Sequence, residues 1–359
     1  MNPARPILCF CLCFFAIAAT APRAHGQPAP TAPLPYMRLG TNDANVVQLE
    51  IAARKFTPAQ GTGSVIWLTA VSHIGETNYY QALQKHLDSQ ALVLFEGIGG
   101  EAMKRTRHAG TNIPSATATQ GTNSTTRANK SELSTLQTVM ARSLDLVFQL
   151  DVIDYDRVHF RNSDISVAEL QKLVRGTNAV TTVSPSAPAK GRPADDELQK
   201  LLKMMDGASA QGALFQSLFQ FIGANPRLQA VAKLTLIEIL GSLRGDLAQA
   251  RGLPLEMKRL FRILIDKRNE AVLADLRAEL ARPAPAKTIA LFYGAAHMDD
   301  FERQLRALGY RPTDELWLPA FTLDLEKSGV TAFELGLVRG MVRMQMQKMF
   351  PAEETPARE

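Results

Sequence analysis

Three short apolar runs of this chain each end at a side chain that can bind a metal ion or carry a proton. The runs and the residues that follow them are 65–68 with His73, 91–95 with Glu96, and 288–293 with His297. Small residues separate both histidines from their runs, whereas Glu96 comes directly after its run. Apolar runs of this length that stop at such boundaries predict buried strands. The three side chains are therefore expected at the carboxyl ends of three strands.

The segment between the first two predicted strands has helical spacing. Tyr80, Leu83 and Leu87 recur at intervals of three and four residues, and Thr77 can cap the helix at its start. A strand, a helix and a second strand predict two parallel strands joined by a right-handed crossover. Glu96 is then expected at the same edge of the sheet as His73, where open α/β sheets place their sites.

The rest of the chain alternates helical patterns with polar or Pro-rich breaks. Helices are predicted over residues 134–151, over residues 197–280 with breaks at 207, 223–226 and 252–254, and over residues 299–308 and 333–349. Asp299 or Asp300 is expected to cap the helix that Gly309 ends, and an extended segment is expected to follow up to residue 323. The final helix is apolar and rich in methionine, which predicts that it docks on the body of the protein.

The domain organisation follows from the start of the chain and from two segments of biased composition. Arg5, an apolar run over residues 7–21 and a small-x-small sequence ending at Gly26 have the pattern of a secretory signal. The predicted units are a signal peptide (1–26), a linker (27–37), one α/β domain (38–349) with mobile loops at 109–130 and 177–195, and a disordered tail (350–359). We expect export to the periplasm or beyond. A retained N-terminal anchor is the alternative, although the apolar run is short for a membrane span.

Composition argues against several classes of function. The cysteines, Cys9, Cys11 and Cys13, all lie in the predicted signal, so the mature chain would have no disulfide, thiol nucleophile or cysteine-bound zinc. The net charge is +5 with basic residues spread along the chain, so no nucleic-acid or anionic-membrane surface is predicted. The chain also has no G-x-S-x-G elbow and no Gly-rich nucleotide loop, which argues against a serine hydrolase or a nucleotide-binding enzyme.

Two imidazoles and a carboxylate at one edge of a sheet can form a catalytic metal site, with three protein ligands and an open position for water. The ion would lower the pKa of its bound water and polarise a carbonyl. Nitrogen and oxygen ligands without cysteine favour manganese, cobalt or zinc. The simpler interpretation of His73 and His297 is a hydrogen-bonded histidine at a strand end. Glu96 is more informative, because a carboxylate that continues a buried strand needs a partner.

Arg268 and Asp164 are further candidates. Arg268 lies among apolar neighbours in a predicted helix, where it is either a solvated or salt-bridged residue or a clamp for an oxyanion or a carboxylate. Asp164 ends a polar segment that we interpret mainly as a charged, capped turn, with Asp164 and His159 as second-rank site residues. Two further histidines are expected at the surface: His86 and His108.

Three blocks of the sequence resemble the TraB/GumN/Tiki superfamily, to which erythromycin-esterase-like and ChaN-like proteins are more distantly related. TAVSHIGETNYYQAL with ALVLFEGI resembles its first conserved block, IDKRNEAVLADL its Arg-containing helix, and LFYGAAHMDDFERQLRALGY its closing block. The family pattern combines two G-x-x-H motifs with a glutamate after the second strand and an arginine on a late helix. These positions fall here on His73, Glu96, Arg268 and His297. Gly294 opens the second motif, whereas Ala70 stands where the first motif has glycine.

The resemblance implies an α/β fold with a mixed, largely parallel central sheet, flanking helices and a pseudo-duplicated core. The similarity of the two strand–loop–His segments independently suggests such a duplication. The helical residues at about 197–280 would then be an insertion.

The resemblance also implies a metal-dependent hydrolase, because metal-dependent peptidase activity is known for Tiki members. In this hypothesis His73, Glu96 and His297 hold or activate a metal-bound water that attacks a peptide or amide bond. Arg268 would stabilise developing negative charge. One of the carboxylates, Glu96 or Asp164, could instead be the general base.

Two other functions remain open at this point. A ChaN-like protein would capture haem or iron, with Tyr79, Tyr80 or a histidine as the ligand. A non-catalytic scaffold would use the same polar cluster only for structure. The substrate, a peptide or another small molecule, is not identified by the sequence. A homodimer is one possible assembly.

Overall fold

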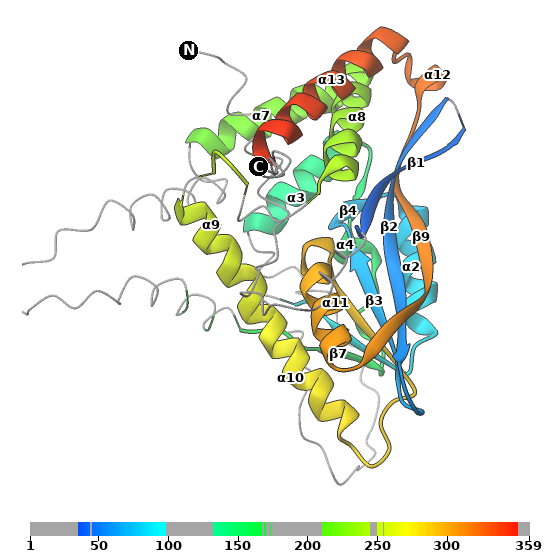
Figure 1. Ribbon diagram of the computed structural model, residues 1–359. Coiled ribbons are helices and arrows are strands. Elements are labelled where there is room, and N and C mark those ends of the chain that lie inside the picture. The colour runs from blue at the N-terminus through cyan, green and yellow to red at the C-terminus, as the bar shows by residue number, and fades with distance from the viewer. Residues whose placement is uncertain are drawn as a thin grey trace, which may run out of the picture.

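The computed structural model describes residues 35–43, 45–97, 132–166, 169, 173, 210–244, 250–253 and 255–350. The predicted signal, most of the linker, both predicted loops and the tail after Phe350 lie outside these residues. Within them the chain forms a mixed α/β fold, in which helices flank a mostly parallel central sheet (Figure 1). The predicted mixed α/β architecture with a largely parallel sheet and flanking helices is confirmed.

The central sheet brings together strands that lie far apart in the sequence. Its strands are β1 (Met37–Asp43), β2 (Val46–Pro58), β3 (Val65–Val71), β5 (Leu92–Phe95), β7 (Phe160–Asn162), β8 (Thr288–Gly294) and β9 (Tyr310–Asp324). They follow the order β1-β2-β3-β8-β5-β7, and β9 pairs with β2. A second, two-stranded sheet joins β4 (Ile74–Gly75) to β6 (Val147–Phe148).

Four strands, β3, β8, β5 and β7, are parallel to one another. β8 lies between β3 and β5, and six of its seven residues are buried. Parallel strands are covered on both faces, which explains why these strands appear in the sequence as continuous apolar runs. The predicted parallel arrangement of β3 and β5 is confirmed, but β8 separates them after returning from the far end of the chain.

The other part of the sheet is antiparallel and is organised by β2. β9 pairs with β2 along its whole length, from Val46 to Pro58. On its other edge β2 pairs first with β1, up to Ile51, and then with β3, from Ala53 to Phe56. One long strand therefore connects the antiparallel ribbon to the parallel strands that carry the site.

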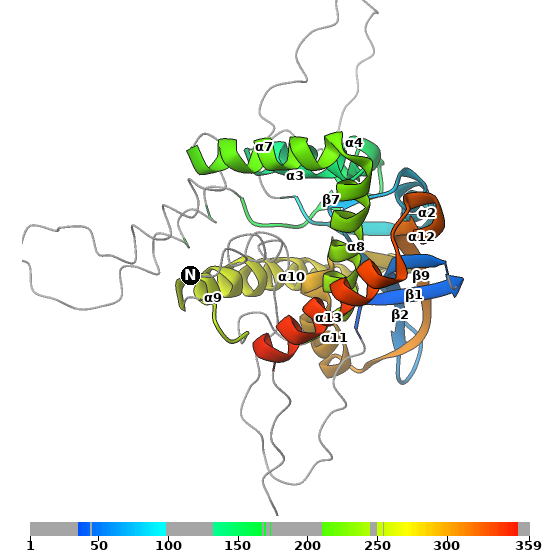
Figure 2. The ribbon, with the colours of Figure 1, turned by 90° about the horizontal axis from the view of Figure 1, so that it is seen from above.

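Helices cover both faces of the sheet. They are α2 (Thr77–Asp88), α3 (Glu132–Ser143), α4 (Gln149–Val152), α7 (Ala210–Ala224), α8 (Pro226–Ser242), α9 (Leu255–Arg262), α10 (Arg268–Leu280), α11 (Met298–Ala307), α12 (Leu325–Ser328) and α13 (Ala332–Met349). Figures 1 and 2 place α2 and α11 on opposite faces, and both helices contact β9. Asn225 caps α8 by accepting hydrogen bonds from the backbone N–H groups of Arg227 and Leu228.

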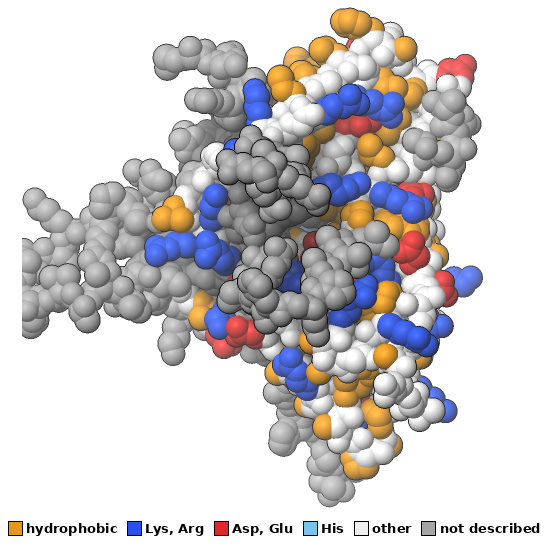
Figure 3. All heavy atoms as spheres, in the orientation of Figure 1, with side chains coloured by type: hydrophobic (Ala, Val, Ile, Leu, Met, Phe, Trp, Pro, Cys, Tyr) orange, Lys and Arg blue, Asp and Glu red, His pale blue; other side chains and the backbone are white. Residues whose placement is uncertain are grey.

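The final helix, α13, packs on α8, while α7 packs on α3 and α8 (Figure 2). The predicted docking of this helix is confirmed. Its outer face is apolar and exposed, and Figure 3 shows hydrophobic side chains over the end of the molecule where α13 lies. The exposed side chains are Phe333, Leu337, Met341 and Met344. In the part of the chain that the structure describes, no helix has both the length and the apolar character needed to cross a bilayer.

Some predicted boundaries are wrong. The helix predicted over residues 134–151 ends at Ser143, because Asp145 has a positive φ of 54° and the chain then forms β6 and α4. β7 lies within the polar segment that was interpreted as a turn. Met37, assigned to the linker, begins β1.

The predicted N-terminal caps are also wrong. Glu76, not Thr77, occupies the cap position of α2, and no side chain makes a capping bond there. His297 occupies the cap position of α11 in place of Asp299 or Asp300. The predicted end of α11 at Gly309 is confirmed by the positive φ of that glycine, 82°.

His86 is not a surface residue as predicted, because its ring packs edge-on against Trp67 and lies 3.2 Å from the Thr69 hydroxyl. Burial lowers the pKa of His86 from 6.5 to about 4. The unfolded chain therefore binds a proton at this imidazole below about pH 6.5, whereas the folded chain does so only near pH 4. The neutral His86 therefore contributes fully to the free energy of unfolding above pH 6.5. This contribution is lost as the pH falls from 6.5 toward 4. Between pH 7 and pH 5 the free energy of unfolding should fall by about 1–2 kcal/mol through His86 alone.

Urea denaturation at these two pH values, on the wild type and His86→Gln, measures that contribution. The variant should lose less stability between pH 7 and pH 5 than the wild type. Equal losses of unfolding free energy in the two proteins would contradict a lowered pKa of His86 in the folded protein.

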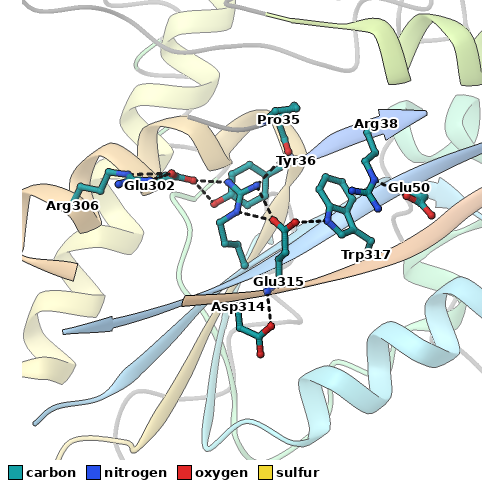
Figure 4. Close-up of polar contacts among 10 residues, drawn as sticks. Pro35, Tyr36, Arg38, Glu50, Glu302, Arg306, Asp314, Glu315 and Trp317 are labelled. Atoms are coloured by element: carbon teal, nitrogen blue, oxygen red, sulfur yellow. Dashed lines mark hydrogen bonds and ion pairs between the residues drawn. The ribbon is translucent and has the colours of Figure 1, made fainter. Parts of the chain in front are cut away.

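A buried ionic cluster lies where β2, β9 and α11 meet (Figure 4). Arg54 donates to Glu302 at 2.7 Å, and both side chains are almost fully buried. Tyr36 also donates to Glu302, at 2.9 Å, and Arg306 holds the other oxygen of that carboxylate at 2.7 Å. Arg54 also reaches Glu315 at 3.4 Å. The cluster fixes the first described residues of the chain to α11 and is separate from the strand ends that carry the predicted site.

Candidate functional site

Four neighbouring parallel strands each deliver a polar side chain at the same edge of the sheet. In the order β3, β8, β5 and β7, these residues are His73, His297, Glu96 and Asp164. Glu96 follows β5 directly, while His297 lies in a 3-10 turn (Ala295–His297) after β8. Open α/β sheets bind their ligands at this edge. The structure therefore brings the three residues predicted at strand ends to one edge and adds Asp164 to them.

Gly294, the last residue of β8, marks the centre of the cluster. A methyl group on its Cα would lie 3.4 Å from Glu96 Oε2, 3.5 Å from His73 Nε2 and 3.8 Å from His297 Cδ2. The three side chains thus surround one point that is left open because residue 294 has no side chain. The backbone N–H of Gly294 also donates to Glu96 Oε2 at 2.7 Å.

Arg268 connects the two carboxylates of the site. Its Nε and Nη2 donate to the two oxygens of Asp164 at 3.0 and 2.7 Å, and Nη2 also donates to Glu96 Oε1 at 2.6 Å. The Asp164 side chain is fully buried and the Glu96 side chain is 14% exposed. Of the interpretations considered for Arg268, the structure shows the salt bridge, which is made to two carboxylates of the protein itself. Two of its nitrogens are already occupied by carboxylates of the protein.

A π-helical turn (Ile263–Lys267) directly precedes Arg268 at the start of α10. Such turns are rare and are found frequently at functional sites. Arg268 and its neighbour Asn269 are both buried and both reach the site, Arg268 through Glu96 and Asn269 through His297. Two consecutive residues of α10 therefore contact side chains that follow two different strands, β5 and β8.

The electrostatics of the site keep its carboxylate charged and one imidazole neutral. Burial acts to raise the pKa of Glu96, but Arg268 above all, helped by both imidazoles and the Gly294 N–H, lowers that pKa well below its ordinary value. Burial lowers the pKa of His297 to about 3, with Arg268 and His73 acting in the same direction and Glu96 opposing. At neutral pH the site thus presents an ionised Glu96 beside a neutral His297.

Each imidazole is held through its Nδ1 atom by an amide side chain. His73 Nδ1 lies 2.9 Å from Gln149 Oε1, and the amide nitrogen of Gln149 donates to the Tyr155 hydroxyl at 2.6 Å. His297 Nδ1 lies 2.6 Å from Asn269 Oδ1. An Nδ1–H that donates to an amide oxygen leaves the Nε2 lone pair available to a ligand.

The metal-binding atoms that the site offers suit a divalent ion of intermediate hardness, such as manganese, cobalt or zinc. Two imidazoles and a carboxylate are nitrogen and oxygen ligands, and the amide partners are of the kind that orients metal-binding histidines. The open position at Gly294 adds a cradle that a side chain would fill. However, among the residues described, no group of three His, Cys, Asp or Glu side chains is arranged to hold an ion. His297 turns Cδ2, the ring carbon bonded to Nε2, toward the shared point.

Other candidates from the sequence lie elsewhere. His159 precedes β7, at the opposite end of that strand from Asp164, and its ring packs on Phe160. Tyr79 and Tyr80 are fully buried, and their hydroxyls bond the backbone of Ser72. Burial raises the pKa of both tyrosines, so neither offers an accessible phenolate to haem or iron. His108 lies outside the described residues.

The two amide side chains bonded to the imidazoles, Gln149 and Asn269, were not predicted as site residues. Their own partners are Tyr155 and Asp300. Asn269 could have been noticed as an uncharged polar residue beside Arg268 on an otherwise apolar helical face. Gln149 and Tyr155 give no comparable signal, because only the tertiary structure brings them to His73.

No protein-family model matches this chain, and no curated protein or solved structure shows significant similarity to it.

Proposed function

We propose that this protein is a metal-dependent hydrolase that cleaves peptide or amide bonds at the cluster of His73, Glu96 and His297. The observation that carries the proposal is the meeting of these three side chains, from three parallel strands, around the open position at Gly294. An ionised carboxylate beside imidazole nitrogens is a donor set that holds ions in hydrolytic sites.

A manganese, cobalt or zinc ion at this site would be held by His73, His297 and Glu96, and would supply a water molecule of lowered pKa. Glu96 is kept charged by Arg268, as a carboxylate that binds a metal ion must be. Arg268 holds that carboxylate in place, and Asp164 in turn fixes the guanidinium through two hydrogen bonds. In this proposal Arg268 therefore acts on Glu96 and not directly on the oxyanion.

The proposal includes membership of the TraB/GumN/Tiki superfamily and a pseudo-duplicated core. It is supported by the placement of His73 and His297 after the adjacent parallel strands β3 and β8, each with an amide side chain on Nδ1. The helices from α7 to α10 would then be the family's insertion. Export through the signal at residues 1–26 and a homodimer remain part of the hypothesis, as does an unidentified peptide or small-molecule substrate.

His297→Ala tests the proposed activity. Hydrolysis of a peptide library by the wild type, with manganese, cobalt or zinc chloride added, should require the ion, and the variant should lose at least about 100-fold in rate. His86→Ala, the same change at a histidine that packs on Trp67, should keep the activity. Unchanged hydrolysis in His297→Ala would rule out this mechanism. A wild type that neither binds a divalent ion nor cleaves any peptide would favour a non-catalytic scaffold.

A further inference from the structure

Two side chains beyond the site form a chain of hydrogen bonds that ends at His297. Asn269 Oδ1 lies 2.6 Å from His297 Nδ1, and Asn269 Nδ2 donates to Asp300 Oδ2 at 2.8 Å. Asn269 is 1% exposed and His297 is 3% exposed, so water has little access to the bond between them, whereas the Asp300 side chain is 18% exposed. The other oxygen of Asp300 accepts from Arg303, one turn further along α11, at 2.9 Å.

The chemistry of Asp300 fixes the direction of every bond in this chain. As a carboxylate paired with Arg303, Asp300 accepts hydrogen bonds and donates none. The NH2 end of the Asn269 amide must therefore face Asp300, which leaves its oxygen facing His297. An amide oxygen cannot donate, so the proton of the imidazole must lie on Nδ1. Nε2 of His297 is then the nitrogen with the free lone pair.

His73 provides a contrast within the same site. Its amide partner, Gln149, bonds the hydroxyl of Tyr155, and a hydroxyl can donate as well as accept. Either orientation of the Gln149 amide can therefore be satisfied, and either nitrogen of His73 can carry the proton. Of the two imidazoles, only His297 is linked to a group that accepts hydrogen bonds and cannot donate them, namely Asp300. That group sets the tautomer of His297.

We propose that Asp300, acting through Asn269, is a positioning residue that holds His297 in its Nδ1–H tautomer. The consequence is that Nε2 carries no proton and keeps a free lone pair for an ion or a proton. The use of Nε2 in hydrolysis depends on the proposed function. The tautomer itself does not, and it can be measured in a protein with no activity.

Nitrogen-15 NMR of ring-labelled, metal-free protein tests the proposal directly. In the wild type, His297 should show a pyrrole-type shift at Nδ1 and a pyridine-type shift at Nε2. Asp300→Asn should remove this preference, because an asparagine at 300 carries an NH2 group that can donate to the Asn269 oxygen and so lets the Asn269 amide turn over. Asp314→Asn, the same change at an exposed position of β9, should leave the His297 signals unchanged.

Exchanging the two side chains supplies a rescue. Asn269→Asp alone places two carboxylates against each other, whereas Asn269→Asp combined with Asp300→Asn restores an acceptor at 269 and a donor at 300. The double variant should regain the Nδ1–H tautomer that Asp300→Asn loses, because the side chain bonded to the imidazole can then only accept. Asp300→Asn should also lower ion affinity or hydrolysis by about 10–100-fold.

A wild-type His297 with its proton on Nε2 would overturn the proposal, as would an Asp300→Asn spectrum identical to that of the wild type. The expected tautomer in a protein without any hydrolytic activity would instead contradict only the proposed function.

Discussion

Arg268→Leu is expected to lower the free energy of unfolding by about 3–5 kcal/mol, because it leaves buried carboxylates without their counter-charge. Glu96 and Asp164 share this one guanidinium, and their side chains are 14% and 0% exposed. Without Arg268 the two acids must repel each other or take up protons. The loss should therefore be smaller at acidic pH, where protonation of the carboxylates removes the uncompensated charge.

Urea denaturation of three variants measures this effect. Arg268→Lys keeps the charge but cannot reproduce the paired bonds to Asp164, so its loss should be intermediate. Arg277→Leu, at an exposed position of the same helix, should change stability by less than about 0.5 kcal/mol. A loss in Arg268→Leu no larger than that in Arg277→Leu would contradict the role of Arg268 as the shared counter-ion.

Gly294→Ala is expected to abolish function while leaving the fold in place. The new methyl group would occupy the shared point at contact distances of 3.4–3.8 Å, which are ordinary for packed atoms. Gly294 has φ −51° and ψ 143°, values that alanine adopts without strain. Stability should therefore change by no more than about 1 kcal/mol. Hydrolysis should fall by at least about 100-fold, because the methyl group keeps the reacting atoms away from the shared point and a misplacement of about 1 Å has an effect of that size.

Gly336→Ala is the matched control for this substitution. Gly336 lies on α13, where an added methyl group meets no atom within 4 Å. It should leave activity unchanged and raise stability slightly, because alanine favours a helix over glycine by about 0.5–1 kcal/mol. Equal activity of Gly294→Ala and the wild type would show that the space at Gly294 is not used.

The strands that carry the site could be predicted because each is covered on both faces. Burial on both faces makes a strand a continuous apolar run, so its end and the polar residue that follows it are visible in the sequence. His73, Glu96 and His297 were found in this way. β2 was not identified, and its partner β9 was predicted only as extended, because their register depends on pairing between residues more than 250 positions apart, such as Ile51 with Leu318.

The contacts inside the site could not be predicted, because they depend on how α10 is placed against the sheet. The sequence left open whether Arg268 is a salt-bridged residue or a clamp, and only the tertiary structure shows that it holds Asp164 and Glu96 together. The π-helical turn before Arg268 has no marker in the sequence. Asp300 was expected to cap α11 and instead orients Asn269.

The central claim is that His73, Glu96 and His297 form one binding centre at Gly294, and calorimetric titration of metal-free protein with manganese or zinc chloride tests it most directly. The account predicts one ion per wild-type chain and at least about 100-fold weaker binding in Gly294→Ala, where a methyl group fills the centre. Wild-type protein that takes up no divalent ion, or Gly294→Ala protein that binds it as tightly as the wild type, would contradict the account.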